Sequence, residues 1–304
     1  MRLCQKWREA VLSGKERRKM RFLILGCNGM AGHMISIYLK EKGYAVTGYA
    51  RSKSPFIDTI IGDVTNFGFL GEVIKKGQYD SVINCVGLLN QFAEKNHPMA
   101  VLLNGYLPHF LAMITHDMET NIIQMSTDCV FSGKTGGYTE ESIPDGTLFY
   151  DRTKALGELD DDKNVTLRNS IVGPDIKVNG IGLLNWFLQQ KECVNGYLGA
   201  IWTGQTTLQL AKTMEYAAIN RVHGLYNMVP ESSINKYDLL CLFNNYIRRK
   251  PIKIYPQEGF IADKTLIRTR YDGFDYKIPD YRTMIIELGE WMRAHKDLYP
   301  QYEL

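Results

Sequence analysis

The stretch "RFLILGCNGMAG" (21–32) decides the fold of this chain. An apolar run ends at Gly26, and glycine returns at positions 29 and 32. The following residues, to Gly43, carry apolar side chains at helical spacing and end on a glycine that is typical of a helix C-cap. We therefore expect a buried strand, a glycine-rich turn and a helix. Such a turn lets backbone N–H groups and the helix N-terminus approach a pyrophosphate.

The same alternation of strand and helix continues along the chain. Further apolar runs predict strands at 44–50, 58–64, 80–87, 121–126 and 164–170. Helical patterns lie between them, among them a long helix over 97–117 in which Pro108 is expected to cause a kink or break. Alternating strands and helices imply a parallel sheet with right-handed crossovers. The predicted fold class is α/β, a Rossmann-type doubly wound parallel sheet.

The pattern becomes irregular after Gly173, which predicts a smaller, discontinuous C-terminal lobe. Helices are expected at 180–191, 205–220, 232–248 and 281–295, with short strands such as "GLYNMV" and "IKIYP" between them. We divide the chain into a basic extension (1–19), an NAD(P)-binding domain (20–173, with a returning segment near 205–230) and a mainly substrate-binding lobe (174–304).

Charge is concentrated at one end of the chain. The net charge is +3 over 304 residues, but the first nineteen residues alone carry +5, which leaves −2 for the rest. The basic segment has no apolar core typical of a secretory signal. It is either an extension upstream of a natural start at Met20 or a basic arm for nucleic acid or membrane. We interpret the body as mildly acidic and not as a nucleic-acid-binding protein.

Neither cysteine nor histidine is arranged as in a metal site. The six cysteines form no C-x-x-C pair, and the six histidines are scattered. Reduced thiols in a cytoplasmic protein are the simplest interpretation. No apolar run approaches the length of a membrane span, so no membrane partner is expected.

The second strand suggests which dinucleotide the turn would bind. It ends in Arg51 where an acidic residue would hold a ribose diol, and a cation there suits a 2′-phosphate, so NADPH is favoured and NADH is the alternative. Asp63, at the end of the third strand, is placed to reach the adenine. The predicted cofactor-binding residues are Gly26, Asn28, Gly29, Met30, Arg51, Asp63, Val64, Cys85, Val86, Gly87, Tyr150 and Lys154.

Three residues form a candidate catalytic set. Thr127 follows the fifth strand, and Tyr150 and Lys154 lie four residues apart on a predicted helix. Reduction of a ketone puts negative charge on its oxygen, and Tyr150 can donate the proton that this oxygen needs. A nearby cation lowers the pKa of a tyrosine, so Lys154 is expected to tune it. Thr127 can hydrogen-bond the ketone.

The chain resembles an extended short-chain dehydrogenase/reductase, and most closely the dTDP-4-dehydrorhamnose reductase family. The shared stretches are "GCNGMAG", "DSVINCVG", "STDCVFSG", "YDRTK" and "LRNSIVGP", which cover about the first 175 residues. The resemblance implies reduction of the 4-keto group of a nucleotide-activated 6-deoxy sugar by NAD(P)H in polysaccharide precursor synthesis. It also implies the catalytic roles given to Thr127, Tyr150 and Lys154. A homodimer is compatible with it.

The resemblance and the residues together suggest a substrate site. By motif, Asp128 would hold sugar hydroxyls, and Cys129 stands where related dehydratases carry an acid. The family usually has tryptophan where this chain has Ile171, so a bulkier, UDP-linked 2-acetamido sugar is an alternative to a dTDP-linked one. The corresponding region around Trp202 lines the family's pocket. Arg268, with its neighbours Lys264 and Arg270, suits a diphosphate.

Two other functions are compatible with these motifs. One is a sugar-nucleotide epimerase that retains NAD. The other is a non-catalytic subunit that binds NADP, as some relatives of the reductases do. The complete set of Thr127, Tyr150 and Lys154 favours the reductase, because a subunit that only binds cofactor does not need all three.

Overall fold

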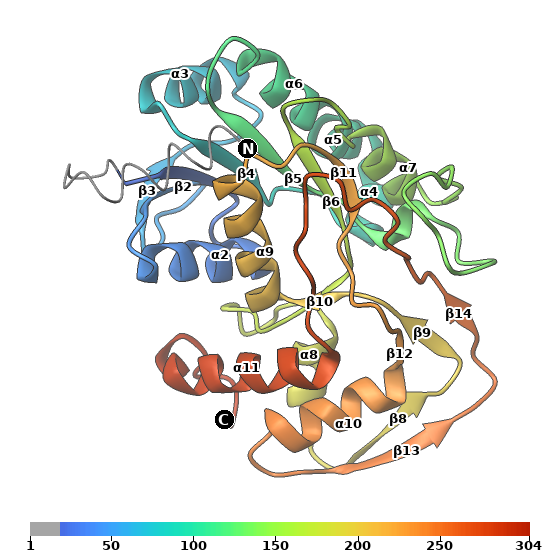
Figure 1. Ribbon diagram of the computed structural model, residues 1–304. Helices are drawn as coiled ribbons and strands as arrows, with labels where there is room; N and C mark the ends of the chain where they lie inside the picture. Colours follow the sequence, from blue (N-terminus) through green and yellow to red (C-terminus); the bar gives the residue numbers. More distant parts are fainter. Residues whose placement is uncertain (1–18) are drawn as a thin grey trace.

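A seven-stranded parallel sheet forms the centre of the computed structural model, which describes residues 19–304 (Figure 1). Its order is β11-β6-β5-β4-β1-β2-β3. The strand order reverses between β1 and β4, so loops at the carboxyl ends of these strands diverge and leave a crevice. The strands are β1 (Arg21–Leu25), β2 (Ala45–Ala50), β3 (Asp58–Ile61), β4 (Ser81–Asn84), β5 (Asn121–Met125), β6 (Val165–Arg168) and β11 (Gly224–Asn227).

Both faces of the sheet are buried, as continuous apolar strands require. Phe22 and Ile24 of β1 pack into one core, with helices α2 (Met30–Glu41) and α9 (Thr207–Ile219). Leu23 and Leu25 face the opposite side, where α3 (Phe67–Gly77) and α6 (Leu107–Ile114) cover the sheet. Figure 1 shows these two helical layers on either side of the strands. The predicted α/β class is confirmed.

The helix predicted over 97–117 is interrupted at a different place from the one expected. It consists of α5 (His97–Ala100), a π-helical stretch η1 (Val101–Tyr106) and α6, and a separate short helix α4 (Asn90–Lys95) precedes it. Pro108 is the second residue of α6, directly after this π-helical stretch. The irregular stretch carries Asn104, whose side chain donates to Leu88 O (3.0 Å) and Thr153 Oγ1 (3.2 Å).

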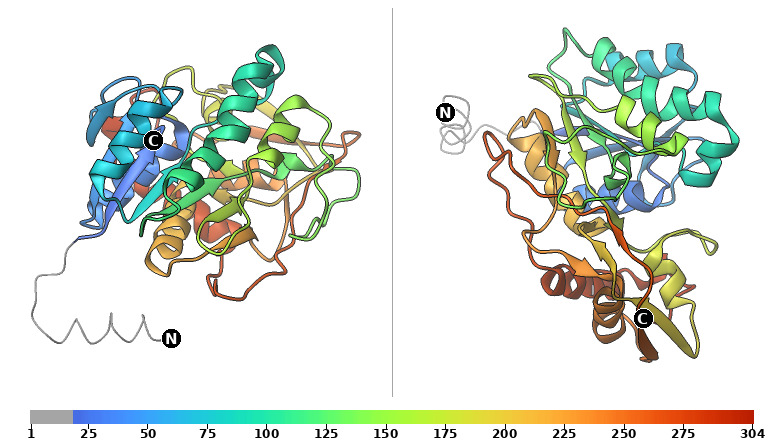
Figure 2. Two further views of the ribbon diagram at one scale, coloured as in Figure 1. Left: turned by 90° about the horizontal axis from the view of Figure 1, so that it is seen from above. Right: turned by 90° about the vertical axis from the view of Figure 1, so that its right-hand side faces the viewer.

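A second lobe lies beside the sheet and consists mainly of later segments, as the right-hand view of Figure 2 shows. Three of its small sheets pair β7 with β10, β8 with β13, and β9 with both β12 and β14. Several of these strands were not expected because each is only two to five residues long. The elements are β7 (Ile171–Val172), α8 (Leu183–Leu188), β8 (Cys193–Tyr197), β9 (Ala200–Trp202), β10 (Gln205–Thr206), β12 (Ile234–Asn235), α10 (Lys236–Tyr246), β13 (Lys253–Gln257), β14 (Ala262–Asp263), α11 (Tyr281–Ala294) and the short turn η3 (Lys296–Leu298).

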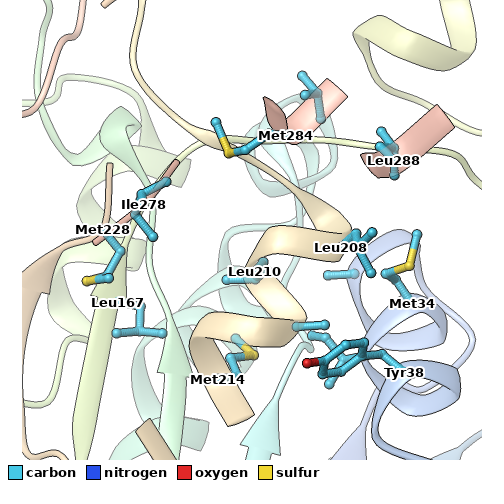
Figure 3. Packing of buried hydrophobic residues seen from close by; sticks show 14 of the residues in the cluster. Met34, Tyr38, Leu167, Leu208, Leu210, Met214, Met228, Ile278, Met284 and Leu288 are labelled. Carbon is cyan, nitrogen blue, oxygen red and sulfur yellow. The ribbon is translucent and has the colours of Figure 1, made fainter. Parts of the chain in front are cut away.

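One continuous core joins the two lobes through α9. Leu210 and Met214 lie on the side of the sheet, near Leu167 and Tyr38, while Met284 and Leu288 of α11 belong to the same cluster (Figure 3). The lobes therefore share buried apolar surface.

The N-terminal basic segment predicted at 1–19 lies outside the described residues, apart from Lys19. Between residues 19 and 304, every helix is too short or too polar to cross a bilayer. The segment expected to return to the first domain, 205–230, contains α9 and β11, and β11 pairs in parallel with β6.

A buried ion pair lies beneath the carboxyl end of the sheet. Arg168, the last residue of β6, donates from Nε and Nη2 to the two carboxylate oxygens of Glu158 at 2.8 and 2.7 Å. Both side chains are less than a tenth exposed. Ser126 donates a third hydrogen bond, of 2.6 Å, to the same carboxylate. This network ties the end of β5 to β6 and to the residues after the Tyr150 helix.

Removal of one partner of this pair should destabilise the protein. Glu158→Ala leaves the Arg168 guanidinium buried without its counter-charge, and we expect a loss of about 3 kcal/mol in the free energy of unfolding. Urea unfolding followed by circular dichroism measures it. The double variant Glu158→Leu/Arg168→Met removes both charges and should lose less than Glu158→Ala alone. An equal or larger loss in the double variant would contradict this account.

Candidate active site

A cleft of about 480 Å³ opens at the point where the strand order reverses. The glycine turn after β1 forms its floor, and the ends of β2, β3 and β4 supply its walls. In Figure 1 these strand ends lie next to the start of α2. The N-terminus of that helix adds partial positive charge to the cleft.

Two glycines make the turn possible. Gly26 has φ +77°, in the left-handed region that side chains rarely adopt. A Cβ on Gly32 would lie only 2.2 Å from the carbonyl oxygen of Gly26, so α2 packs against the turn without a side chain between them. Asn28 extends across the cleft and donates to Ser52 O at 2.9 Å, which joins the turn to the end of β2. The cleft therefore has the shape and the backbone donors that a dinucleotide requires.

Two charged residues predicted for the cofactor face this cleft. Arg51 follows β2, and Asp63 follows β3. Hydrogen bonds from the Thr65 N–H (2.9 Å) and hydroxyl (2.8 Å) lower the pKa of Asp63, with a smaller contribution from Arg51. Asp63 is therefore an ionised hydrogen-bond acceptor.

Most of the predicted cofactor residues line the cleft, and three do not. Met30, Tyr150 and Lys154 are absent from its wall. The cleft also takes in Lys177, from an irregular loop of the second lobe that no strand-end pattern could indicate. The predicted residues in its lining are Gly26, Asn28, Gly29, Arg51, Asp63, Val64, Cys85, Val86 and Gly87.

The candidate catalytic residues converge beyond the end of β5. Thr127 caps a short turn, η2 (Asp128–Val130), and its Oγ1 accepts from the Cys129 N–H at 3.1 Å. Tyr150 and Lys154 lie on α7 (Phe149–Leu156), which packs against η2 and η1. Lys154 Nζ donates to the carbonyl oxygen of Met125, the last residue of β5, at 2.6 Å.

Burial dominates the protonation of the two α7 residues. The pKa of Tyr150 is raised, first by burial and then by Cys129 and Asp128, while a hydrogen bond with Thr127 lowers it in part. The pKa of Lys154 falls from 10.5 to about 8, because burial disfavours its charge. The ammonium bonds to the Met125 carbonyl oxygen and is not among the main causes of the Tyr150 pKa shift, so the tuning role of Lys154 stays a prediction. A protonated phenol is nonetheless the form that donates a proton.

A second cleft, of about 490 Å³, includes the two residues that follow Thr127. Asp128 and Cys129 line it from the sheet lobe, and Trp202 lines it from β9. Apolar and aromatic side chains make up much of its remaining wall. Among its described lining residues the cations are Lys236 and Lys264.

Lys236 is the less expected of the two cations. It is the first residue of α10, and its ammonium lies 4.7 Å from the centroid of the Trp202 ring. Burial lowers its pKa to about 8, and Asp128 and Cys129 act in the opposite direction. Its partner Asp128 has a raised pKa because it too is buried. Sequence alone could not find Lys236, since it looks like an ordinary first-turn residue of a helix.

Two predicted substrate residues need correction. Arg268 does not line the second cleft: its three nitrogens donate to the carbonyl oxygens of Arg270, Phe274 and Tyr276, and three aromatic rings surround the guanidinium. Ile171 packs against the main core, and its neighbour Ser170 faces the cleft instead. Successive residues of an extended segment point to opposite sides, which explains why Ser170 and not Ile171 lines the cleft.

The cysteines near the two clefts are poor nucleophiles. Burial raises the pKa of Cys85 and of Cys129 to about 12, so both thiols are neutral at physiological pH. Cys27 is fully buried, and its pKa is raised to about 11. None of these three cysteines therefore supplies a thiolate at physiological pH.

Three comparisons relate the chain to known proteins. A probable low-salt glycan biosynthesis reductase of Haloferax volcanii is 34% identical over 143 residues, 46% of this chain and 48% of that protein. A dTDP-4-keto-6-deoxy-D-glucose reductase of Streptomyces niveus is 27% identical over 261 residues, 83% of this chain and 87% of that protein. The chain spans about half the length of the first curated relatives it matches.

The fold comparison agrees with the sequence comparison. The crystal structure of a dTDP-4-dehydrorhamnose reductase from Bacillus anthracis in complex with NADP superposes with a TM-score of 0.74 at 18% identity, covering 90% of this chain and 99% of that one. At this identity the likeness concerns the fold. The family model of the RmlD substrate binding domain matches residues 20–175, which include the glycine turn and all three candidate catalytic residues. The chain thus belongs to the RmlD substrate binding domain family.

Proposed function

We propose that this protein is an NADPH-preferring reductase of the 4-keto group of a nucleotide-activated 6-deoxy sugar. The observation that carries the proposal is the set of Thr127, Tyr150 and Lys154 at the end of β5, next to a second cleft that Asp128 and Cys129 line, in a sheet that has a glycine-turn cleft where its strand order reverses. The relative from Streptomyces niveus, aligned over most of both chains, is named for reduction of such a sugar. A dTDP-linked sugar is the first candidate, and a UDP-linked 2-acetamido sugar is the alternative.

The residues of the chain have separate tasks in this reaction. NADPH, when bound, supplies the hydride to the carbonyl carbon. Tyr150 Oη donates its proton to the carbonyl oxygen, and burial keeps that proton on the phenol until it is needed. Thr127 Oγ1 hydrogen-bonds the same oxygen and orients it. Lys154 is held at the end of β5, where its ammonium can contact a ribose hydroxyl.

Lys236 and Lys264 are proposed to bind the substrate diphosphate. They replace Arg268 in this role, because they are the cations of the second cleft among the described residues. A diphosphate in a cleft with apolar walls needs nearby positive charge. Trp202 and Tyr197, which also line the cleft, offer flat surfaces for the rest of the nucleotide.

Tyr150→Phe tests the reductase mechanism. Without the phenol proton, kcat should fall at least about 100-fold while cofactor affinity stays unchanged. NADPH absorbance followed with dTDP-4-keto-6-deoxyglucose measures it. Tyr255→Phe, a change of an exposed tyrosine in β13, is the matched control. Undiminished turnover by Tyr150→Phe would exclude this mechanism.

The substrate affinity should depend on pH through Lys236. Its ammonium loses charge as the pH rises through about 8, so KM for the sugar nucleotide should rise above that pH. Lys236→Arg keeps a positive charge at alkaline pH and should remove this dependence of KM. A KM that still rises in Lys236→Arg would assign the titration to another group.

Arg51 should determine the preference for NADPH. Arg51→Ala removes the cation proposed to face the 2′-phosphate, and the Kd for NADPH should rise about tenfold while that for NADH stays constant. Fluorescence titration of both cofactors measures it. Lys53→Ala is the control, because Lys53 lies two residues further on and does not line the cleft. Equal losses for both cofactors would contradict the assignment.

A further inference from the structure

Lys177 is the second cation of the cofactor cleft, and it comes from outside the strand ends. It lies in the loop 174–182, between β7 and α8. The cations in the described lining of the cleft are Lys177 and Arg51. Lys177 forms no ion pair or side-chain hydrogen bond with another described residue. A cation that faces a cleft without a protein partner is available to a ligand.

The loop lies against the beginning of α2. A Cβ built on Gly182 would be 3.4 Å from Met30 Sδ, and Met30 is the first residue of that helix. The glycine turn and the α2 N-terminus form the part of the cleft where backbone amides meet a pyrophosphate. Arg51 stands instead at the end of β2, the position that suits a 2′-phosphate. The two cations thus enter the cleft from different segments, Arg51 from the end of β2 and Lys177 from the loop next to α2.

The conformation of the loop is set by hydrogen bonds around Asp175. The Lys177 N–H donates to Asp175 Oδ1 at 2.9 Å, and the Gly180 N–H donates to Lys177 O at 2.9 Å. Asn185 of α8 donates to Gly180 O. These bonds fold the loop into a compact turn with Lys177 at its exposed side.

Residues 296–304, here called the closing segment, hold this loop in place. The buried hydroxyl of Tyr302 accepts from the Asp175 N–H at 3.1 Å and donates to Asn185 Oδ1 at 2.6 Å. Gln301 Nε2 donates to Asp175 O at 2.6 Å. The segment is therefore bonded to both ends of the turn that carries Lys177.

The closing segment also reaches the glycine turn. His33, buried in α2, bonds through Nδ1 to Gly29 O (3.0 Å) and through Nε2 to the Tyr299 hydroxyl (2.8 Å). Burial lowers the pKa of His33, so the ring is neutral: Nδ1–H donates and Nε2 accepts. The closing segment thus bonds directly to Asp175 in the loop and, through His33, to the glycine turn.

We propose that Lys177 binds the pyrophosphate of the nicotinamide cofactor, and that the closing segment positions Lys177 through Tyr302. The proposal rests on the proposed function in that it requires a nicotinamide dinucleotide in this cleft. Lys177 is a binding residue, and Tyr302 is a positioning residue that acts through the loop 174–182.

The test measures cofactor binding alone, by fluorescence titration of the full chain with NADPH and NADH. Lys177→Gln should raise the Kd of both cofactors by about the same factor, roughly tenfold, since both contain the pyrophosphate. Lys177→Arg should retain most of the affinity. Lys191→Gln, a change of an exposed lysine that does not line the cleft, should leave both Kd values unchanged.

Three results would overturn the proposal. An unchanged Kd in Lys177→Gln would mean that Lys177 does not bind the cofactor. A loss confined to NADPH places the lysine at the 2′-phosphate instead. Failure of the unaltered protein to bind either cofactor refutes both this proposal and the proposed function, whereas the first two results leave the reductase function intact.

A double-variant cycle tests the positioning role. Tyr302→Phe removes the hydroxyl and should raise both Kd values about threefold in the unaltered background, but hardly at all in Lys177→Gln, because the residue that it positions is gone. Circular dichroism and Tm show whether each variant folds. Equal losses in the two backgrounds would mean that Tyr302 acts only on general stability, and would refute its positioning of Lys177.

Discussion

The contact between Gly26 and Gly32 determines where ligands can bind in this protein. With no side chain at Gly32, α2 starts directly against the carbonyl group of Gly26, where a Cβ would lie 2.2 Å from the oxygen. The free N–H groups and partial positive charge of the helix end therefore face the crevice beside β1. Because the sheet is buried on both faces, its carboxyl edge is where polar groups can meet water and ligands. The candidate binding and catalytic residues therefore lie along that edge.

Burial has opposite consequences for the tyrosine and the lysines of the site. It raises the pKa of Tyr150 and so preserves its proton, and it lowers the pKa of Lys154 and Lys236 to about 8, so that their charge is lost within the physiological to alkaline range. The site thus contains a protonated phenol, Tyr150, and two lysines with a lowered pKa. A negatively charged ligand would raise the pKa of these lysines and so keep them charged. The ion pair of Glu158 and Arg168 supports the end of β5 to which Lys154 is bonded.

The second lobe depends on the first for its core. Helix α9 buries one side against α2 and the sheet and the other against α11, so one apolar core extends through both lobes. This arrangement lets loops of the later segments reach the cofactor cleft, as Lys177 does, and lets α10 present Lys236 beside Asp128. Residues more than a hundred positions apart in the sequence form each of the two clefts.

The sequence by itself determined the parallel sheet, the glycine turn and the approximate places of Thr127, Tyr150 and Lys154. These features follow from local patterns: apolar runs predict buried strands, and the carboxyl ends of parallel strands share one edge. Only the tertiary structure decided which cations line the two clefts. Arg268, Lys264 and Arg270 are equally plausible as a diphosphate site in the sequence, but carbonyl groups and aromatic rings enclose Arg268, while Lys264 lines the second cleft together with Lys236, which no sequence pattern indicated. The direction of a long side chain depends on which distant segments pack around it, and no local pattern records that packing.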